Sequence, residues 1–150
     1  MLRSGMLGAA LAVVLAGCGK PPPPQIVEVE GVVRLEGKPL KNVAVRFVPV
    51  ADDATEYVAS GVTDEAGRFR LTCKGQTGAC AGQNRVLVME ADIPRRLQDE
   101  KAQAELAKYF QSLGGRPIPP KYANLVESPL TADVKADQKV YTFELKRLSP

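Results

Sequence analysis

The sequence predicts a mainly β fold: an antiparallel β-sandwich of about seven strands with one helical insertion near residues 94–113. Three observations carry this prediction. Apolar and polar residues alternate with a period of two in most apolar segments, which is typical of strands with one buried face. The 13 Gly and 12 Pro residues place turn signals between these segments, and only one segment shows helical spacing. Together they favour a sandwich over a helical bundle.

The first two strands are predicted between residues 26 and 49. From residue 26 to 35, apolar residues or Gly fill the odd positions, and Glu or Arg fills three of the five even positions. Residues 36–39 have turn chemistry, because Gly accepts a positive φ and Pro holds φ at about −65°. The alternation returns at 43–47 and ends at Pro49, which cannot donate to a strand ladder.

Further strands are predicted at residues 57–62, 68–73, 85–90 and 140–146, with a short one at 131–134. Between the first two of these, Asp64 can bond its own backbone and Gly67 suits the left-handed conformation, so a tight turn is expected. Residues 86–89 are uninterrupted apolar, as in a strand covered on both faces. The length of the chain fits one such domain, spanning residues 26–150.

Capping signals bound the helical insertion. Asp92 can cap its start, Pro94 suits the first turn, and Gly114 ends it. Four apolar residues share one face: Leu106, Tyr109, Phe110 and Leu113. We expect this face to pack against the sandwich. The alternative is a helix that binds a partner or a membrane surface, and its mixed charges argue against the membrane.

Residues 1–17 are predicted to be a signal peptide for export. Arg3 supplies a positive charge, and the apolar run at 7–15 is too short to span a bilayer, which takes about 20 residues. Residues 15–18 read Leu-Ala-Gly-Cys, which resembles the lipobox of bacterial lipoproteins. The resemblance implies cleavage before Cys18, lipid on its thiol, and attachment to a membrane of the bacterial cell envelope. The alternative is a plain secretory leader.

Residues 18–25 are predicted to be the lipidated Cys and a Pro-rich spacer. The four prolines at 21–24 favour an extended polyproline II segment, which rises about 3.1 Å per residue. Such a spacer would hold the domain away from the lipid surface, where two or three acyl chains give a stable anchor.

Short motifs along the domain resemble one family. They are Glu-Gly-Val-Val at 30–33, Gly-Lys-Pro-Leu at 37–40, the run at 43–49, and Thr-Asp with Gly-Arg-Phe between 63 and 69. Together they resemble the opening of carboxypeptidase-regulatory-like, transthyretin-type domains, and the C-terminal part resembles a lipoprotein group of planctomycete-type bacteria. The resemblance implies an immunoglobulin- or transthyretin-like sandwich in the cell envelope, and no particular activity. Asn84 stands where the family usually has an aromatic, and we expect it to loosen the core.

Cys73 and Cys80 remain as a pair once Cys18 carries lipid. An even pair in an exported protein favours a disulfide, because the two residues lie at the end of one predicted strand and just before the next. Closing this eight-residue loop would stabilise the fold by about 2.5 kcal/mol. The alternative is a redox or metal site, which the six intervening residues and the lack of further ligands disfavour.

The residues of most catalytic and metal sites are missing. The chain has no His, which excludes imidazole bases and ligands, including those on which hydrolases and dioxygenases with this type of sandwich depend. The acid pairs at 52–53 and 64–65 could bind Ca²⁺ weakly, but solvated turn residues are the expectation. We therefore predict no catalytic residue, no metal and no cofactor. A net charge of +3 gives no reason to expect nucleic-acid binding.

The expected function is that of a non-catalytic binding or structural module, with an envelope protein or a glycan as the partner. The loops at 51–56 and 95–120 are the expected contact surfaces. Two alternatives stay open. One is an enzyme accessory or hydrolase-like domain that uses loop carboxylates or Tyr122. The other is a periplasmic carrier of a small ligand, which needs an apolar pocket between the sandwich and the helix.

Overall fold

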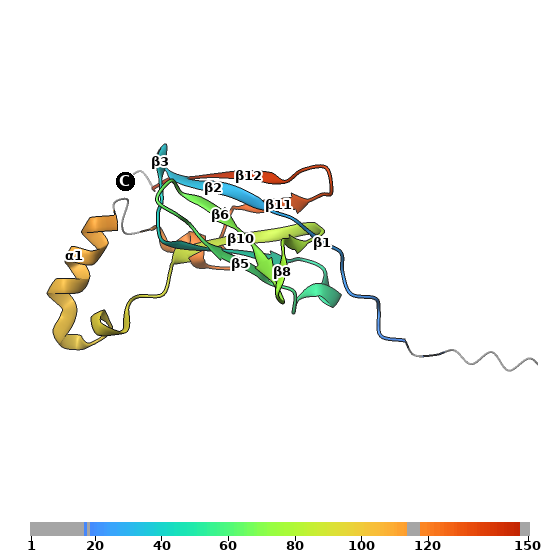
Figure 1. Ribbon diagram of the computed structural model, residues 1–150, viewed down its shortest axis with the longest axis horizontal. Helices are drawn as coiled ribbons and strands as arrows, with labels where there is room; N and C mark the ends of the chain where they lie inside the picture. The colour runs from blue at the N-terminus through green and yellow to red at the C-terminus, as the bar shows by residue number, and fades with distance from the viewer. Residues whose placement is uncertain (1–16, 18, 114–117, 148–150) are drawn as a thin grey trace, which may run out of the picture.

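The computed structural model of the protein describes residues 17, 19–113 and 118–147. In this part of the chain, β-strands form a six-stranded, a four-stranded and a two-stranded sheet, and α1 (Gln103–Leu113) is the one α-helix. The two larger sheets enclose the buried core, and α1 projects from one end (Figure 1). The predicted mainly β sandwich with one helical insertion is confirmed.

The six-stranded sheet is antiparallel throughout. Its order is β11 (Thr131–Val134), β10 (Gly82–Glu90), β4 (Val43–Pro49), β5 (Ala59–Val62), β7 (Thr72–Cys73) and β8 (Gln76–Thr77). The central pair, β10 and β4, runs in register from Glu90 opposite Val43 to Asn84 opposite Pro49. Pro49 is the last residue of β4, which is where a residue without an N–H donor fits.

The four-stranded sheet contains a parallel pair, where the sequence predicted only antiparallel ones. β2 (Glu30–Leu35) runs parallel to β12 (Val140–Leu145) and antiparallel to β3 (Lys38–Pro39) and β6 (Arg68–Arg70). The chain between β11 and β12 crosses from one sheet to the other, so β12 does not pair with β11 as a hairpin would. The Tyr141 hydroxyl stabilises this connection: it donates to the Asp133 carbonyl at 3.0 Å and accepts from the Lys135 N–H at 3.4 Å.

The predicted strand at 26–35 is divided in two. β1 (Ile26–Val27) pairs with β9 (Ala79–Cys80) in the two-stranded sheet, and β2 begins at Glu30. Between them Val29 is fully buried, and its carbonyl accepts from the Leu71 N–H at 3.1 Å. Apolar alternation continues across the division, so hydropathy alone does not reveal it. Two short 3₁₀ helices, η1 (Asp52–Ala54) and η4 (Pro120–Ala123), lie in connections.

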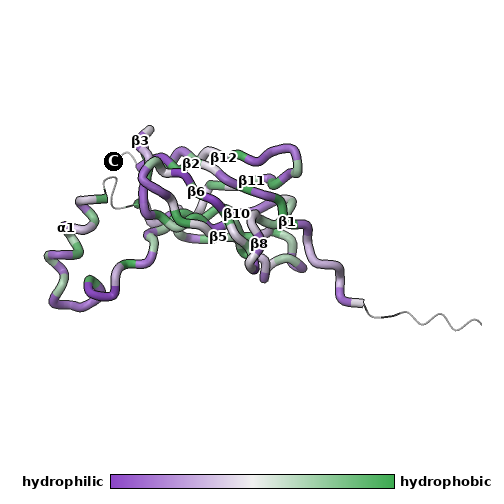
Figure 2. The backbone as a smooth tube through the Cα atoms, viewed as in Figure 1, coloured by the Kyte–Doolittle hydropathy of each residue, from purple (hydrophilic) through white to green (hydrophobic). Residues whose placement is uncertain are grey.

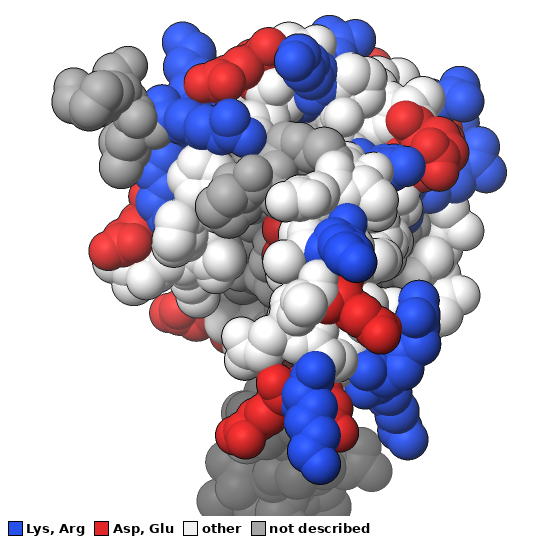
Figure 3. All heavy atoms as spheres, turned by 90° about the vertical axis from the view of Figure 1, so that its left-hand side faces the viewer, with Lys and Arg blue, Asp and Glu red and all other residues white. Residues whose placement is uncertain are grey.

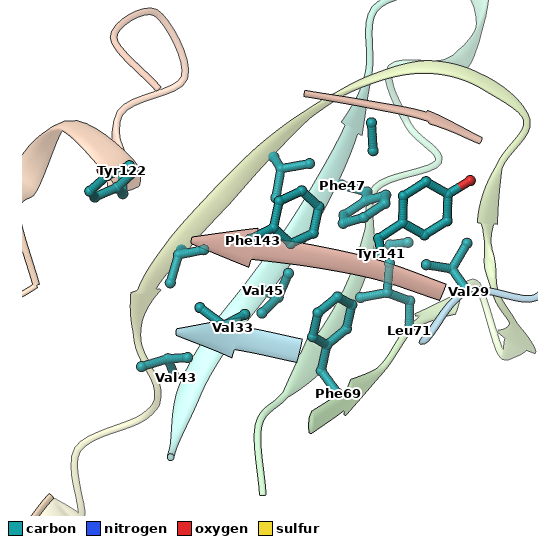
Figure 4. Packing of buried hydrophobic residues seen from close by; sticks show 14 of the residues in the cluster. Val29, Val33, Val43, Val45, Phe47, Phe69, Leu71, Tyr122, Tyr141 and Phe143 are labelled. Atoms are coloured by element: carbon teal, nitrogen blue, oxygen red, sulfur yellow. The ribbon is translucent and has the colours of Figure 1, made fainter. Parts of the chain in front are cut away.

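Four aromatic rings fill the space between the sheets: Phe47, Phe69, Tyr141 and Phe143 (Figure 4). In four pairs of these rings the centroids lie 5.8–6.3 Å apart, and the three pairs that include Phe47 are tilted or edge-to-face, the favourable arrangements for rings. Gly31 lies against this cluster, because a Cβ there would be 2.7 Å from Cζ of the Phe69 ring. Along the sandwich strands, hydrophobic and hydrophilic residues alternate, as strands with one buried face require (Figure 2).

Asn84 is buried. We expected it to loosen the core, but its side chain forms hydrogen bonds with nearby backbone groups. Its Nδ2 donates to the carbonyls of Cys80 and Gly82, both at 2.9 Å. These bonds hold the turn between β9 and β10. Among the described residues, the Oδ1 atom of Asn84 has no hydrogen-bond partner.

Residues 95–113, which we call the arm, contain three helical segments where a single helix was predicted: η2 (Arg95–Leu97), η3 (Glu100–Ala102) and α1. Asp99, not Asp92, supplies a cap, accepting from the Lys101 N–H at 3.1 Å. No residue of α1 is buried, and the main packing partners of α1 are η2 and η3. We expected the apolar face to pack on the sandwich. Instead it packs mainly within the arm, where Leu97 is buried, and only partly on the sandwich.

Candidate functional site

The predicted lipid attachment residue, Cys18, and most of the predicted signal peptide lie outside the described residues. The spacer that follows is described from Gly19 onward, and residues 19–23 are exposed and have no regular secondary structure. Figure 1 shows this segment leaving the sandwich at the end opposite the arm. The molecule therefore has two distinct poles, one at the spacer and one at the arm.

The spacer joins the sandwich immediately before β1. The Gln25 carbonyl accepts from the Ala81 N–H at 2.8 Å, and β1 then pairs with β9. Ile26 and Val27 are partly buried and pack on the core. The chain after the spacer is thus held by residues 79–81, the segment that contains Cys80.

Cys73 and Cys80 are both buried free thiols, so the predicted disulfide is not formed in this structure. Cys73 lies on β7 and Cys80 on β9. These two strands contact each other, as expected if the two cysteines lie close together. Burial raises the pKa of both thiols, and a negative charge on Cys73 raises the pKa of Cys80 further. Because disulfide exchange begins with a thiolate, burial slows the oxidation of this pair.

A hydrogen bond joins the arm to the sandwich. The Asn42 side chain donates from Nδ2 to the Tyr109 hydroxyl at 2.6 Å. Asn42 has a φ of 54°, a left-handed conformation that Asn adopts more readily than most residues. The sequence patterns did not identify Asn42 as a contact residue. The one feature that points to it is the position of an Asn shortly after the Gly-Lys-Pro motif.

A cleft of about 440 Å³ lies between α1 and the sandwich. It is lined by Lys41, Asn42, Thr63, Asp64 and Glu65 of the sandwich and by Tyr109 and Leu113 of α1. The sandwich side is polar and carries both signs of charge, with Lys41 Nζ 3.5 Å from Glu65 Oε2. This lining suits a polar group better than the apolar ligand that the carrier alternative requires.

The arm presents a partly exposed apolar face. Leu106, Tyr109, Phe110 and Leu113 are each half-buried, and the rings of Tyr109 and Phe110 lie 5.7 Å apart. Figure 3 views the molecule from the arm end, where acidic and basic side chains are interspersed. A surface of mixed charge lacks the cationic face of membrane-surface helices. The exposed apolar face is therefore better suited to a protein groove.

The turn carboxylate of Asp64 is held in place by local hydrogen bonds. Its Oδ1 accepts from the N–H groups of Arg68 and Ala66, both at 2.9 Å, and Oδ2 lies 3.3 Å from the Arg68 guanidinium. These interactions, the Arg68 N–H first, lower the pKa of Asp64. The carboxylate thus stabilises its own turn, which is the role expected of a turn Asp.

Tyr122, the other residue of the enzyme alternative, is also engaged in the fold. Its ring is buried, and its hydroxyl accepts from the Lys146 N–H at 2.8 Å and donates to the Lys146 carbonyl at 3.1 Å. Both bonds pin η4 to the end of β12. The hydroxyl is thus occupied by backbone partners.

The acid pair Asp52 and Asp53 is exposed in η1. Across residues 17, 19–113 and 118–147, no three His, Cys, Asp or Glu side chains come together as ligands for a metal ion. Within the same ranges, no helix has the length and apolar character needed to cross a membrane.

Comparison with known proteins gives no match: no family model fits the chain, and neither a curated protein nor a solved structure is significantly similar to it. The resemblance to carboxypeptidase-regulatory-like domains stays a prediction from the motifs.

Proposed function

We propose that the protein is a bacterial envelope lipoprotein whose β-sandwich is a non-catalytic binding module. Residues 1–17 direct export, Cys18 carries lipid, and residues 19–25 form the spacer. The observation that carries this proposal is the two-pole arrangement, with the spacer and the arm at opposite ends of the sandwich (Figure 1). A chain anchored through its spacer presents the arm away from the membrane.

The chemistry of the described side chains supports a binding role. The Asp64 carboxylate and the Tyr122 hydroxyl, which the enzyme alternative would use, are bonded to backbone groups. The chain has no His to serve as a general base. By contrast, the arm carries a half-exposed apolar face, which is the kind of surface that a helix presents to a partner groove.

The carboxypeptidase-regulatory-like identity is part of the same proposal. In its Gly-Lys-Pro motif, Gly37 lies in the turn between β2 and β3, and Lys38–Pro39 form β3. The turn residues Glu36 and Gly37 have φ values of 51° and 80°. Gly67, in the second motif, has a φ of 73°. These glycines occupy positive-φ positions for which glycine is best suited, which supports a family signature built on turns.

Lipid attachment is tested by metabolic labelling with an alkyne fatty acid in a bacterial host, followed by intact mass of the full chain. We expect label and a chain that begins at Cys18. Cys18→Ser should abolish the label, and Cys80→Ala, the matched loss of another thiol, should retain it. An unlabelled, uncleaved wild-type chain would overturn the proposal.

The binding role is tested by site-specific photo-crosslinking in intact cells. A photoreactive residue at Phe110 on the arm should give a discrete adduct with an envelope protein. The same residue at Thr142, exposed on the outer face of β12, is the control and should give none. Absence of an adduct from Phe110 and from the neighbouring Leu106 would contradict the assignment of the arm as the contact surface.

Export also bears on the cysteines, because the envelope is an oxidising compartment. We propose that Cys73 and Cys80 become oxidised there to a disulfide by a disulfide-donating oxidoreductase. Protein from the native envelope should then gain about 2 Da on reduction, the mass of two hydrogens. Two free thiols in freshly isolated protein, trapped by alkylation, would refute the oxidised state.

A further inference from the structure

The first strand after the spacer is held by residues 71–81, which we call the clasp. Ala81 donates its N–H to the Gln25 carbonyl at 2.8 Å, and Leu71 donates to the Val29 carbonyl at 3.1 Å. Between these bonds, β1 pairs with β9, and in the described part of the chain it pairs with no other strand. The clasp therefore holds the point where the spacer enters the domain.

Gly78 shows how closely the clasp lies on β1. A Cβ at this position would be 2.1 Å from the Val27 carbonyl oxygen, and Gly78 has a φ of 127°. The Gly78 N–H donates to the Leu71 carbonyl at 2.7 Å, so this bond joins two parts of the clasp backbone. No side chain larger than hydrogen fits here without moving β1 away.

The two cysteines bracket this close approach. Cys73 ends β7, and Cys80 lies in β9 directly opposite Ile26 of β1. Both are buried, their strands are in contact, and a charge on Cys73 acts on Cys80. A bond between them would close an eight-residue loop that contains Gly78 and all of β8.

We propose that Cys73 and Cys80 form a redox lock on the clasp: the disulfide suppresses opening of the clasp, and the dithiol, in which the structure shows β1 in place, permits transient release of β1. The lock rests on the proposed export, which supplies the oxidising compartment and the anchored spacer. When β1 leaves, residues 25–28 join the spacer and lengthen it by about 13 Å, at about 3.3 Å per extended residue. Each such opening gives the domain a longer reach from its anchor, and reduction makes openings more frequent.

The chemistry is a thiol–disulfide exchange with a protein disulfide as the oxidant. One cysteine thiolate attacks the donor disulfide and releases the first donor thiol, and the second cysteine then displaces the remaining donor sulfur. The pair loses two electrons and two protons, and the donor is reduced to two thiols. Reduction by a dithiol donor reverses both steps.

The test is amide hydrogen exchange on the purified full chain in detergent, with oxidised and reduced dithiothreitol as the probes. Closing an eight-residue loop shifts the equilibrium between open and closed clasp by a factor of about 70 in the chain-entropy model. We expect exchange of the Val27 and Ala81 amides to slow by at least about tenfold on oxidation, because exchange follows local opening. The amides of β4 and β10 at the sheet centre should not change.

Two variants separate the lock from other effects. Cys80→Ala, which keeps a small apolar side chain, should make exchange insensitive to the oxidant. Gly78→Ala should speed exchange at β1 in both redox states, because it pushes β1 away. Failure of the native chain to form the disulfide, or slowing at β1 of less than about tenfold on oxidation, overturns the lock. Lipid labelling is a separate readout, so failure of the lock and failure of the lipoprotein proposal are distinguishable.

Discussion

Gly31→Ala tests the parallel pairing of β2 with β12 and the aromatic core beneath it. Gly31 lies opposite Tyr141 in the register of these strands. A Cβ at Gly31 would lie 2.0 Å from the Tyr141 carbonyl oxygen and 2.7 Å from Phe69 Cζ, whereas real Cβ contacts are not closer than 3.0 Å. The backbone of β12 must therefore retreat by about 1 Å, and the Phe69 ring must move with it.

The cost follows from these contacts. Overpacking a well-packed core costs about 1–3 kcal/mol, and displacement of backbone puts this site at the upper end. Replacing Gly by Ala also restricts the unfolded chain, which offsets the cost by up to about 1 kcal/mol. The net loss in the free energy of unfolding is about 2 kcal/mol, which lowers Tm by about 6 °C in a domain of this size.

Thermal unfolding followed by circular dichroism measures this change. Gly19→Ala in the spacer is the matched control, because nothing lies within 4 Å of its Cβ position, and its Tm should equal that of the wild type. A Gly31→Ala variant with wild-type Tm would refute the register of β2 against β12.

Three further perturbations test the turn, the tyrosine and the thiols. Asp64 has a folded-state pKa lowered chiefly by the Arg68 N–H, so its contribution is present above the unfolded pKa and is lost as the pH falls through the folded one. Between about pH 5 and pH 3, Tm of Asp64→Asn should fall less than that of the wild type, and parallel decreases would contradict this. Tyr122→Phe leaves the N–H and carbonyl of Lys146 without their hydrogen-bond partner. It should lower the free energy of unfolding, measured by urea titration, by about 1 kcal/mol. An unchanged urea midpoint would count against the observed bonds. The buried thiols of reduced Cys73 and Cys80 should react with a maleimide about 100-fold more slowly in native protein than in urea, and equal rates would show that they are exposed.

The strand content of the sandwich could be predicted because its strands have one face on the core and one in water. The alternation at 43–47 and at 140–146 placed Phe47 and Phe143 in the core, where they pack 5.8 Å apart. The turns were predictable for a local reason, since Gly37 and Gly67 occupy positive-φ positions. Such features depend on neighbours in sequence, which is what a pattern records.

The candidate site was less predictable because its contacts join distant segments. The pairing of Asn42 with Tyr109 spans 67 residues, and no local pattern marks either residue as a partner of the other. The helical face was correctly identified, but its packing on η2 and η3 depends on where the chain turns after Glu90. The nearness of Cys73 and Cys80 was inferred from a turn, while their burial as free thiols emerged from the folded strands.

The hydropathy pattern was enough to predict a β-sandwich with a helical insertion, because one-sided burial imposes a period of two on each strand. Three features are visible only in the folded domain: β12 runs parallel to β2, residues 26–35 are shared between two sheets, and the arm stands away from the core. These choices depend on which strand edges are unoccupied when the sheets come together. Strands from the whole chain compete for these edges, so the hydropathy of a single segment does not show which strands will pair.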